Sequence, residues 1–526
     1  MPFSTLPNEL VSQILSHASP SGTRYNCLFV NRRFYSLMLP IIYRDLQIPF
    51  IHHNRLVTLI RTVRRNAFLG EYTKTLCLGE DPFDNKRSVE RIIGSNDINK
   101  LFPSLQKIEL FAMTFERAML YRFWAYCARA KGLEEVVLHY PDLVPLVQPI
   151  KGLKRLTWSF TGCEISPVLM LPEGYDETKW ILRKWLQSLG SCTPGLEKLV
   201  VGCVGREGSW GISDRIGLEV EQVNRGQVEL VRLENLREFE WREGEGISPA
   251  KVWLDVPELV LEMHKDQLEK VRWEVALHKD DIYSAGSTGS VLWDGMKGAK
   301  GVKKLELRVC PASPIPASQP GVVDTQAVWN TSNAILVVSE NFLGGTRDWD
   351  PSGLEGLKIR FSMITGSPLL ENEFLKSLEK AKYLKSFEMT FGIPTFVDAA
   401  VPASSEDIGK KDFHYWYYDV EAMTGIIQNL PTSLEKLFLN FDGKHDIHDK
   451  YRQYEFGPME DTVDKWDEDG SIRSQIKGIV SQRRSIPKKL LYDRMPNLRK
   501  VYIGGYDILD STGGAEAGIA KLSLVN

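Results

Sequence analysis

One short pattern of apolar positions recurs along most of this 526-residue chain. It reads apolar-x-x-apolar-x-apolar, as in Leu105, Ile108 and Leu110. Its last two apolar positions lie two residues apart, which is the period of a β-strand with one buried face. Each occurrence therefore predicts a short strand. The twelve occurrences begin at Thr73, Leu105, Leu133, Leu153, Leu196, Leu236, Leu268, Val302, Leu354, Leu384, Leu434 and Leu498.

Several segments between these strands carry apolar residues at the period of a helix. Phe115, Met119, Phe123 and Cys127 recur every fourth residue, and Gly132 follows them as a stop signal. Further helices are predicted over residues 180–189, 374–381 and 423–430. Alternating strands and helices predict parallel strands joined by crossovers. The recurring phrase makes the expected α/β fold a solenoid with a curved parallel sheet.

This stretch resembles degenerate leucine-rich repeats, although its repeats are long. The phrases recur about every 36 residues, whereas leucine-rich repeats run about 20 to 29 residues. The resemblance therefore implies an irregular solenoid with insertions. The longest gaps, at residues 202–235, 310–353, 392–433 and 440–497, predict loops. Such loops can carry recognition or be solvated inserts, and the sequence leaves both open.

A different apolar pattern occupies the first 48 residues. Pro7 suits the first turn of a helix, because its missing N–H would be unpaired there in any case. Leu10, Val11, Ile14 and Leu15 then form an apolar stripe at helical spacing. We therefore expect an amphipathic helix at the start of the chain.

A second, shorter helix is predicted with Phe34, Leu37 and Met38 on one face and a stop at Pro40. A helical module of roughly 45 residues is close to the size at which a domain needs outside support to bury its core. Part of the apolar surface of these two helices is therefore expected to meet a partner.

The order of residues in this module resembles an F-box, in the form common in fungal proteins. It contains Leu-Pro-x-Glu-Leu at 6–10, Ile-Leu at 14–15, Leu-x-Val-x-Arg-x-Phe at 28–34 and Leu-Pro-x-Ile-Tyr-Arg at 39–44. In that family the module docks on the Skp-type linker of a cullin-RING ubiquitin ligase. Carried over position by position, the resemblance places these residues at or beneath the linker surface: Leu6, Pro7, Leu10, Ile14, Leu15, Val30, Phe34, Leu37 and Pro40.

Two positions depart from the family pattern. Asn31 stands where a Cys is frequent, and Phe34 stands where a Trp is frequent. Phe34 keeps an aromatic anchor, so these departures bear on the affinity for the linker. The alternative interpretation is that the segment is a helical cap of the larger repeat domain.

The resemblance implies three parts: an F-box over 1–48, a degenerate leucine-rich-repeat solenoid over 49–510 and a C-terminal tail over 511–526. The expected function is that of a substrate-recognition adaptor, which binds the linker and through it a cullin scaffold, and holds an unknown protein substrate on the repeats. It would perform no catalysis and need no cofactor. A linker-bound protein that acts outside a ubiquitin ligase and an unrecognised hydrolase or transferase remain as alternatives.

Charge and cysteine content limit the expected partners and the expected location of the protein. The net charge of −3 argues against a general nucleic-acid or membrane-surface role, so we expect neither as a partner. Seven scattered cysteines without a Cys-x-x-Cys pair suggest neither a disulfide framework nor a zinc site. With no run of about 18 apolar residues and no signal-like start, the expected location is intracellular, cytoplasmic or nuclear.

No constellation of residues points to catalysis. The chain contains no phosphate loop, no G-x-G-x-x-G, no H-E-x-x-H and no G-x-S-x-G sequence. His445 and His448, beside Asp446 and Asp449, form the only dense group of histidines and aspartates, and they lie in a predicted loop rather than on a rigid metal-binding frame. An aromatic run at 414–418 suits either a binding surface or packing on the solenoid.

The strand phrases also predict a charged surface. In a parallel stack the third, fifth and seventh positions of each phrase share one face. The fifth positions of neighbouring phrases then alternate in charge: Glu240, Arg272, Glu306, Lys358 and Glu388. The third and the seventh positions form the two flanking rows. Lys270 adjoins Lys304 in the third-position row, and Arg308 adjoins Arg360 in the seventh-position row. An unpaired surplus of these four cations would suit an acidic or phosphorylated target. A solvated face without a ligand is the alternative.

Overall fold

The computed structural model describes the strands, most of the helices and their short connections. The described residues are 6–17, 25–51, 53–80, 98–111, 117–139, 144–161, 172–204, 230–243, 255–277, 285–297, 299–311, 349–361, 373–392, 427–442, 494–503 and 506–507. They fall into two compact units, each with its own internal packing. The first comprises Met1–Val204 with Ser209–Leu236, and the second comprises Gly205–Gly208 with Arg237–Asn526.

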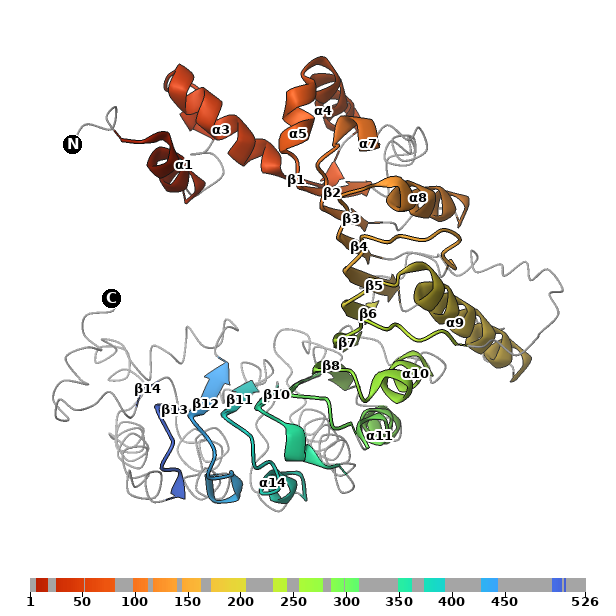
Figure 1. The fold of residues 1–526 in the computed structure, drawn as a ribbon, viewed down its shortest axis with the longest axis vertical. Helices are drawn as coiled ribbons and strands as arrows, with labels where there is room; N and C mark the ends of the chain where they lie inside the picture. The colour runs from red at the N-terminus through yellow and green to blue at the C-terminus, as the bar shows by residue number, and fades with distance from the viewer. Residues whose placement is uncertain are drawn as a thin grey trace, which may run out of the picture. The chain divides into compact units, whose positions relative to one another are not determined.

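The first unit opens with helices and continues as a parallel sheet with helical crossovers (Figure 1). Its described elements are α1 (Asn8–Ser16), α3 (Arg32–Arg44), β1 (Asp45–Ile51), α4 (His53–Arg65), α5 (Ala67–Tyr72), β2 (Thr75–Glu80), α7 (Ile98–Leu101), β3 (Lys107–Phe111), α8 (Arg117–Arg129), β4 (Glu135–His139), β5 (Arg155–Thr161), α9 (Pro172–Cys192) and β6 (Lys198–Val204). Strands β1 to β6 pair in sequence order and in parallel.

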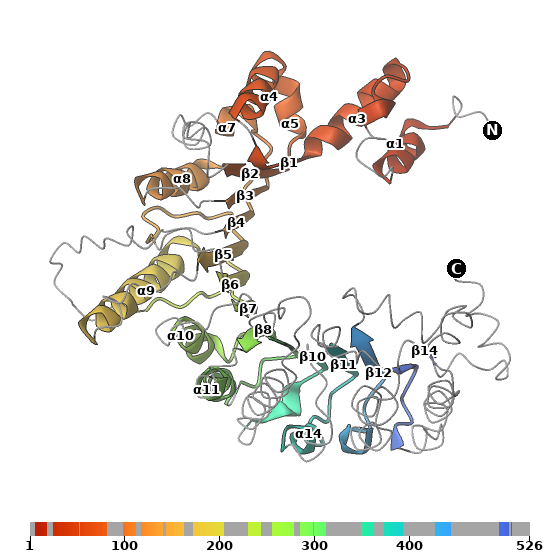
Figure 2. The ribbon, with the colours of Figure 1, turned by 180° about the vertical axis from the view of Figure 1, so that it is seen from behind.

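The second unit repeats this plan, with α10, α11 and α14 on one face of its sheet (Figure 2). Its described elements are β7 (Glu238–Glu243), α10 (Asp255–His264), β8 (Lys270–Leu277), α11 (Ala285–Met296), β9 (Lys304–Pro311), the 3-10 turn η6 (Pro351–Gly353), β10 (Gly356–Phe361), α14 (Glu373–Leu378), β11 (Ser386–Gly392), β12 (Lys436–Asp442), β13 (Lys500–Ile503) and β14 (Tyr506–Asp507). Strands β7 to β13 are parallel and β14 is antiparallel to β13.

All twelve predicted phrases become strands, from β2 to β13. Their register aligns equivalent positions, so that Leu110, Leu138 and Trp158 lie side by side on β3, β4 and β5. These sixth-position side chains are fully buried, as the predicted period of two requires. Neither unit closes its sheet, because strands pair only with their sequence neighbours. The open parallel sheet with helical crossovers confirms the α/β, solenoid-like fold class.

Large aromatic rings fill the space between the sheet and its helices. In the first unit the ring of Trp158 on β5 stacks on Trp124 of α8 at 5.6 Å and meets Trp185 of α9 edge-on at 5.1 Å. In the second unit Trp241 and Trp273 lie 6.2 Å apart on β7 and β8. All five rings are buried. Each ring removes a large apolar area from water, which helps these long repeats to hold their helices on the sheet.

Two predictions about the N-terminal region are wrong in detail. The second helix does not stop at Pro40, because α3 continues through it to Arg44. Pro40 removes the hydrogen bond that the Ser36 carbonyl would accept, but Ser36 is exposed and water can take its place. The predicted boundary at residue 48 also falls inside a strand, since β1 pairs with β2 through Leu46 and Ile48. The repeat sheet therefore begins at Asp45.

The predicted inserts and the tail lie mostly outside the described residues. This applies to 205–229, 312–348, 393–426, 443–493 and 508–526. The dense group of histidines and aspartates and the aromatic run at 414–418 fall within these ranges. The helix predicted over 423–430 is described only from Ile427 onward, where Ile427 and Leu430 are buried.

Candidate interaction surfaces

Helices α1 and α3 form a small core of their own at the start of the first unit. Val11, Leu15 and Met38 are its buried centre, and six apolar side chains and a cysteine pack around them. These partly buried neighbours are Leu6, Cys27, Leu28, Phe34, Leu37, Ile41 and Ile42. The helical spacing of these residues thus directs one stripe of each helix inward, and α3 then leads directly into β1.

Two polar side chains fix the geometry of this core. Arg33 of α3 donates a hydrogen bond from Nε to Oδ1 of Asn8 at 2.8 Å, and its guanidinium also donates to the Leu6 carbonyl. Asn31 is the N-cap of α3, and its side-chain oxygen accepts from the backbone N–H of Phe34 at 2.9 Å. Asn31, a departure from the family pattern, therefore starts the helix that carries Phe34.

The apolar stripe of α1 is divided between the core and the surface. Val11 is fully buried and Leu15 is 4% exposed, whereas Leu10 is 47% and Ile14 is 48% exposed. Leu10 and Ile14 lie one helical turn apart, so they present a common apolar strip. The segment before α3 adds further exposed apolar side chains, notably Val30.

The nine residues predicted at or beneath a linker surface fall into three classes of exposure. Pro7, Leu10, Ile14 and Val30 are exposed, while Leu15 is buried in the N-terminal core. The remaining four are partly buried, and they are Leu6, Phe34, Leu37 and Pro40. Sequence reasoning did not single out the exposed aromatic pair Tyr25 and Phe29, whose rings meet edge to face at 5.3 Å. Their spacing of four residues could have indicated this pair, because residues four apart are neighbours on the surface of a helix.

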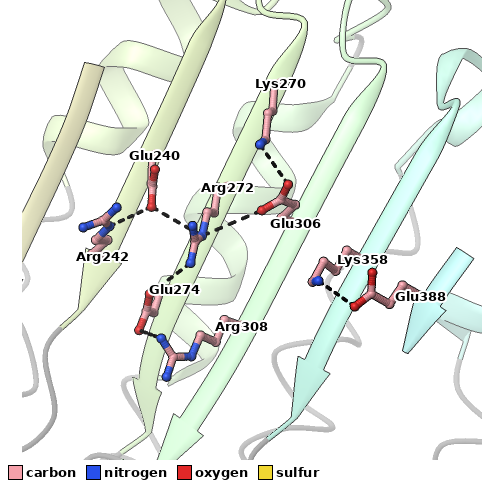
Figure 3. Close-up of polar contacts among 9 residues, drawn as sticks. All are labelled: Glu240, Arg242, Lys270, Arg272, Glu274, Glu306, Arg308, Lys358 and Glu388. Atoms are coloured by element: carbon pink, nitrogen blue, oxygen red, sulfur yellow. Dashed lines mark hydrogen bonds and ion pairs between the residues drawn. The ribbon is translucent and has the colours of Figure 1, made fainter. Parts of the chain in front are cut away.

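The second unit presents the predicted rows of charge on the face opposite its helices (Figure 3). Glu240 of β7 pairs in register with Arg272 of β8, and Arg272 pairs with Glu306 of β9. Lys358 of β10 follows, and then Glu388 of β11, whose carboxylate lies 2.5 Å from the Lys358 ammonium. The alternating fifth-position row is confirmed.

Arg272 lies at the centre of this network. Its Nε is 3.3 Å from Oε1 of Glu240 and 3.9 Å from Oε2 of Glu306, and its Nη2 is 3.9 Å from Oε2 of Glu274. Glu240 is buried and also accepts a hydrogen bond from Arg242 at 2.6 Å. Two cations therefore compensate the charge of this buried carboxylate, as burial of a charge requires.

The premise that the flanking rows are unpaired is wrong. Lys270 lies 2.8 Å from Glu306, and Arg308 lies 2.8 Å from Glu274. Arg308 lies directly opposite Glu274 on the neighbouring strand, whereas Glu306 lies two residues beyond Lys304, the register partner of Lys270, so only the Lys270 pair runs diagonally (Figure 3). The other two candidates, Lys304 and Arg360, lie in the predicted register beside Lys270 and Arg308.

The corresponding face of the first unit carries a smaller charged group. Glu135 of β4 receives Lys107 of β3 at 2.7 Å and Arg155 of β5 at 2.6 Å. Burial opposes ionisation of Glu135, but the hydrogen bonds from Lys107 and Arg155 outweigh it, so the pKa of this carboxyl is below its ordinary value. His139, which stacks on Phe111 at 4.4 Å, lies 2.9 Å from Glu109.

A further row of charge, which sequence reasoning missed, lies just before the strands. Within each unit, the backbone N–H of a second phrase position donates to the carbonyl of the same position in the preceding phrase, at 2.8 to 2.9 Å. The side chains there alternate in sign, and ion pairs join Lys154 to Glu134 at 3.0 Å and Lys303 to Glu269 at 3.6 Å. In the second unit the row reads Arg237, Glu269, Lys303, Glu355, Lys385, Glu435 and Arg499.

The described part of the chain shows no arrangement suited to a metal ion or a membrane span. No three or more His, Cys, Asp or Glu side chains among these residues could hold a metal together. None of the described helices is long and apolar enough to cross a bilayer. Cys27, Cys77, Cys127 and Cys192 are free thiols.

Comparison with known proteins adds no family or relative. No protein-family model matches the chain, and no curated protein sequence matches it.

Proposed function

We propose that the N-terminal module is an F-box that docks on a Skp-type linker, and that the chain is the substrate-recognition adaptor of a Skp-cullin-F-box ubiquitin ligase. The observation that carries this proposal is the division of the α1 stripe. Val11 and Leu15 complete the small core, while Leu10 and Ile14 remain about half exposed beside it. Large apolar side chains grouped on a surface are typical of a protein-protein interface.

The sequence order supports the same assignment. The exposed residues Pro7, Leu10, Ile14 and Val30 all belong to the positions at which the F-box pattern meets its linker. A helical cap that served only the repeats would bury this strip against them. In the structure α3 packs against α5, whereas α1 packs against α3.

In this proposal the repeats capture the target protein and the chain performs no chemistry. The linker and the cullin would hold a conjugating enzyme near the captured target, so that transfer of ubiquitin to a target lysine becomes effectively intramolecular. The long parallel sheet supplies a rigid surface for the target, because every strand is hydrogen-bonded to its neighbours within its unit.

Affinity purification of the tagged full chain tests the proposal directly. We expect a Skp-type linker and a cullin to copurify with the wild type and to be lost with Leu10→Asp. Val147→Asp is a matched control, because Val147 is also an exposed apolar residue but lies between β4 and β5. Recovery of the linker without the cullin would point to a role outside a ubiquitin ligase. Absence of the linker from the wild-type sample would contradict the F-box assignment.

A further inference from the structure

The exposed face of β8, β9 and β10 places like charges beside one another. Lys270 on β8 lies in register with Lys304 on β9, and Arg308 on β9 lies in register with Arg360 on β10. Like charges directly opposite each other on neighbouring strands are destabilising. These two pairs therefore contrast with the fifth-position row on the same strands, in which charges alternate.

Cations are in surplus on this face. Among the described residues of the three strands, it holds two carboxylates, Glu274 and Glu306, and six cations, namely Lys270, Arg272, Lys304, Arg308, Lys358 and Arg360. The bordering Glu240 and Glu388 contact Arg272 and Lys358 and reduce the surplus without removing it. The surplus arises in a chain whose net charge is −3.

Both carboxylates within the face are already shared between cations. Glu306 contacts Lys270 and Arg272, and Glu274 contacts Arg308 and Arg272. Lys304 is exposed at the start of β9, and its neighbour on β10 is Gly356. Because that glycine carries no side chain, the Lys304 side chain lies over it, with its Cγ 3.7 Å from the place that a Cβ of residue 356 would take.

We propose that this cationic face binds an extended anionic segment of a target protein, running along β9. Lys304 and Arg308 lie four residues apart, which is about 13 Å at the rise of a strand. A partner in extended conformation reaches both if its anionic side chains are also four residues apart. Arg308 and Arg360 then flank one carboxylate or phosphate group, for which paired guanidinium groups are well suited.

This inference deepens the proposed function, since the bound segment belongs to the target that the adaptor would capture. It can be tested without the linker, by fluorescence anisotropy of labelled peptides with the purified full chain. One probe is a ten-residue polyglutamate peptide, and the second is an extended Gly/Ser peptide with phosphoserine at positions 3 and 7. The two probes distinguish carboxylate from phosphate as the anion.

We expect saturable binding of at least one probe, and Arg308→Gln with Arg360→Gln should weaken it at least tenfold. Binding should also weaken several-fold between 50 and 200 mM salt, because exposed charges are screened within about 8 Å at physiological ionic strength. The matched control is Lys107→Gln with Arg155→Gln, which removes two cations from the sheet face of the first unit and should leave binding unchanged.

Absence of saturable binding, equal weakening by the control pair, or tighter binding of a single-stranded oligonucleotide would overturn the inference. If circular dichroism shows that the arginine double variant is misfolded, Lys304→Gln replaces it, because Lys304 is exposed. That variant should weaken binding about threefold, and unchanged binding would also overturn the inference. A linker pull-down on the same samples separates the two proposals: loss of linker binding contradicts only the F-box, and loss of peptide binding only the cationic face.

Discussion

Leu10 and Val11 are neighbours on α1, yet Leu10 is 47% exposed and Val11 is fully buried. The helix turns by about 100° per residue, so successive residues face different surroundings. Val11 packs with Leu15 and Met38 in the N-terminal core, and Leu10 lies with Ile14 on the strip that we assign to the linker. One helix therefore carries a buried face and an exposed apolar face side by side, and the exposed one is the binding face in our proposal.

This division predicts a large loss of stability for one truncation and almost none for another one residue away. Leu15→Ala removes buried contacts and should destabilise the N-terminal core by about 2–5 kcal/mol. Ile14→Ala removes an exposed side chain and should change stability by no more than about 0.5 kcal/mol. Hydrogen exchange of the α1 and α3 amides measures both effects locally, without requiring the whole chain to unfold in one step. Equal effects would mean that the strip is buried in solution.

The cap of α3 predicts a second stability difference. Asn31→Ala removes the acceptor of the Phe34 N–H and should cost about 1 kcal/mol, within the usual range for a lost N-cap. Asn66 gives a matched control, because it precedes α5 at the N-cap position but makes no side-chain cap hydrogen bond. Faster amide exchange in α3 of Asn31→Ala, compared with α5 of Asn66→Ala, is the expected result.

The Glu135 cluster predicts an acid-sensitive contribution to stability. Because its folded pKa lies below the ordinary value of 4.5, the ionised form is favoured by folding. The stabilisation is present above pH 4.5 and is lost as the pH falls through the lowered pKa. Glu135→Gln should therefore lower the melting temperature at pH 7, and the difference from wild type should shrink as the pH falls below 4.5. A difference that is constant with pH would contradict this account.

The alternating row before the strands predicts a charge-swap rescue. Glu269→Lys places a third cation between Arg237 and Lys303 and should destabilise the second unit by about 0.5–1 kcal/mol, because the pair with Lys303 is half exposed. Adding Lys303→Glu restores an oppositely charged pair and should recover part of the loss. The coupling measured by this double-mutant cycle should decrease in 1 M salt, where screening is strong.

Much of the repeat fold follows from local periodicity. The phrase located β2 to β13 because a buried sheet face imposes the same apolar spacing on every strand. The same phrase also predicts β1, because Tyr43, Leu46 and Ile48 have its spacing, with an aromatic residue in the leading position. That strand was missed because its residues were assigned to the N-terminal module instead.

The polar contacts were harder to predict, because they depend on side-chain reach. In-register neighbours follow from the phrase, and the prediction that Arg308 is unpaired compared it only with Arg360, although the same row places Glu274 opposite Arg308 on β8. The structure pairs Arg308 with this in-register Glu274, and it pairs Lys270 diagonally with Glu306, which the long lysine side chain reaches across two residues of β9. The helix through Pro40 likewise depended on a fact that the sequence alone does not contain, namely that Ser36, one turn before Pro40, is exposed.

Titration of the purified full chain with a purified Skp-type linker tests the central claim most directly. The wild type should bind, and Leu10→Asp should weaken binding at least a hundredfold, because an unpaired carboxylate in an apolar interface costs several kcal/mol. Its melting profile should match that of the wild type, since Leu10 contributes little to the core. Failure of the wild type to bind, or a collapse of the melting profile in Leu10→Asp with linker binding retained, would contradict the account.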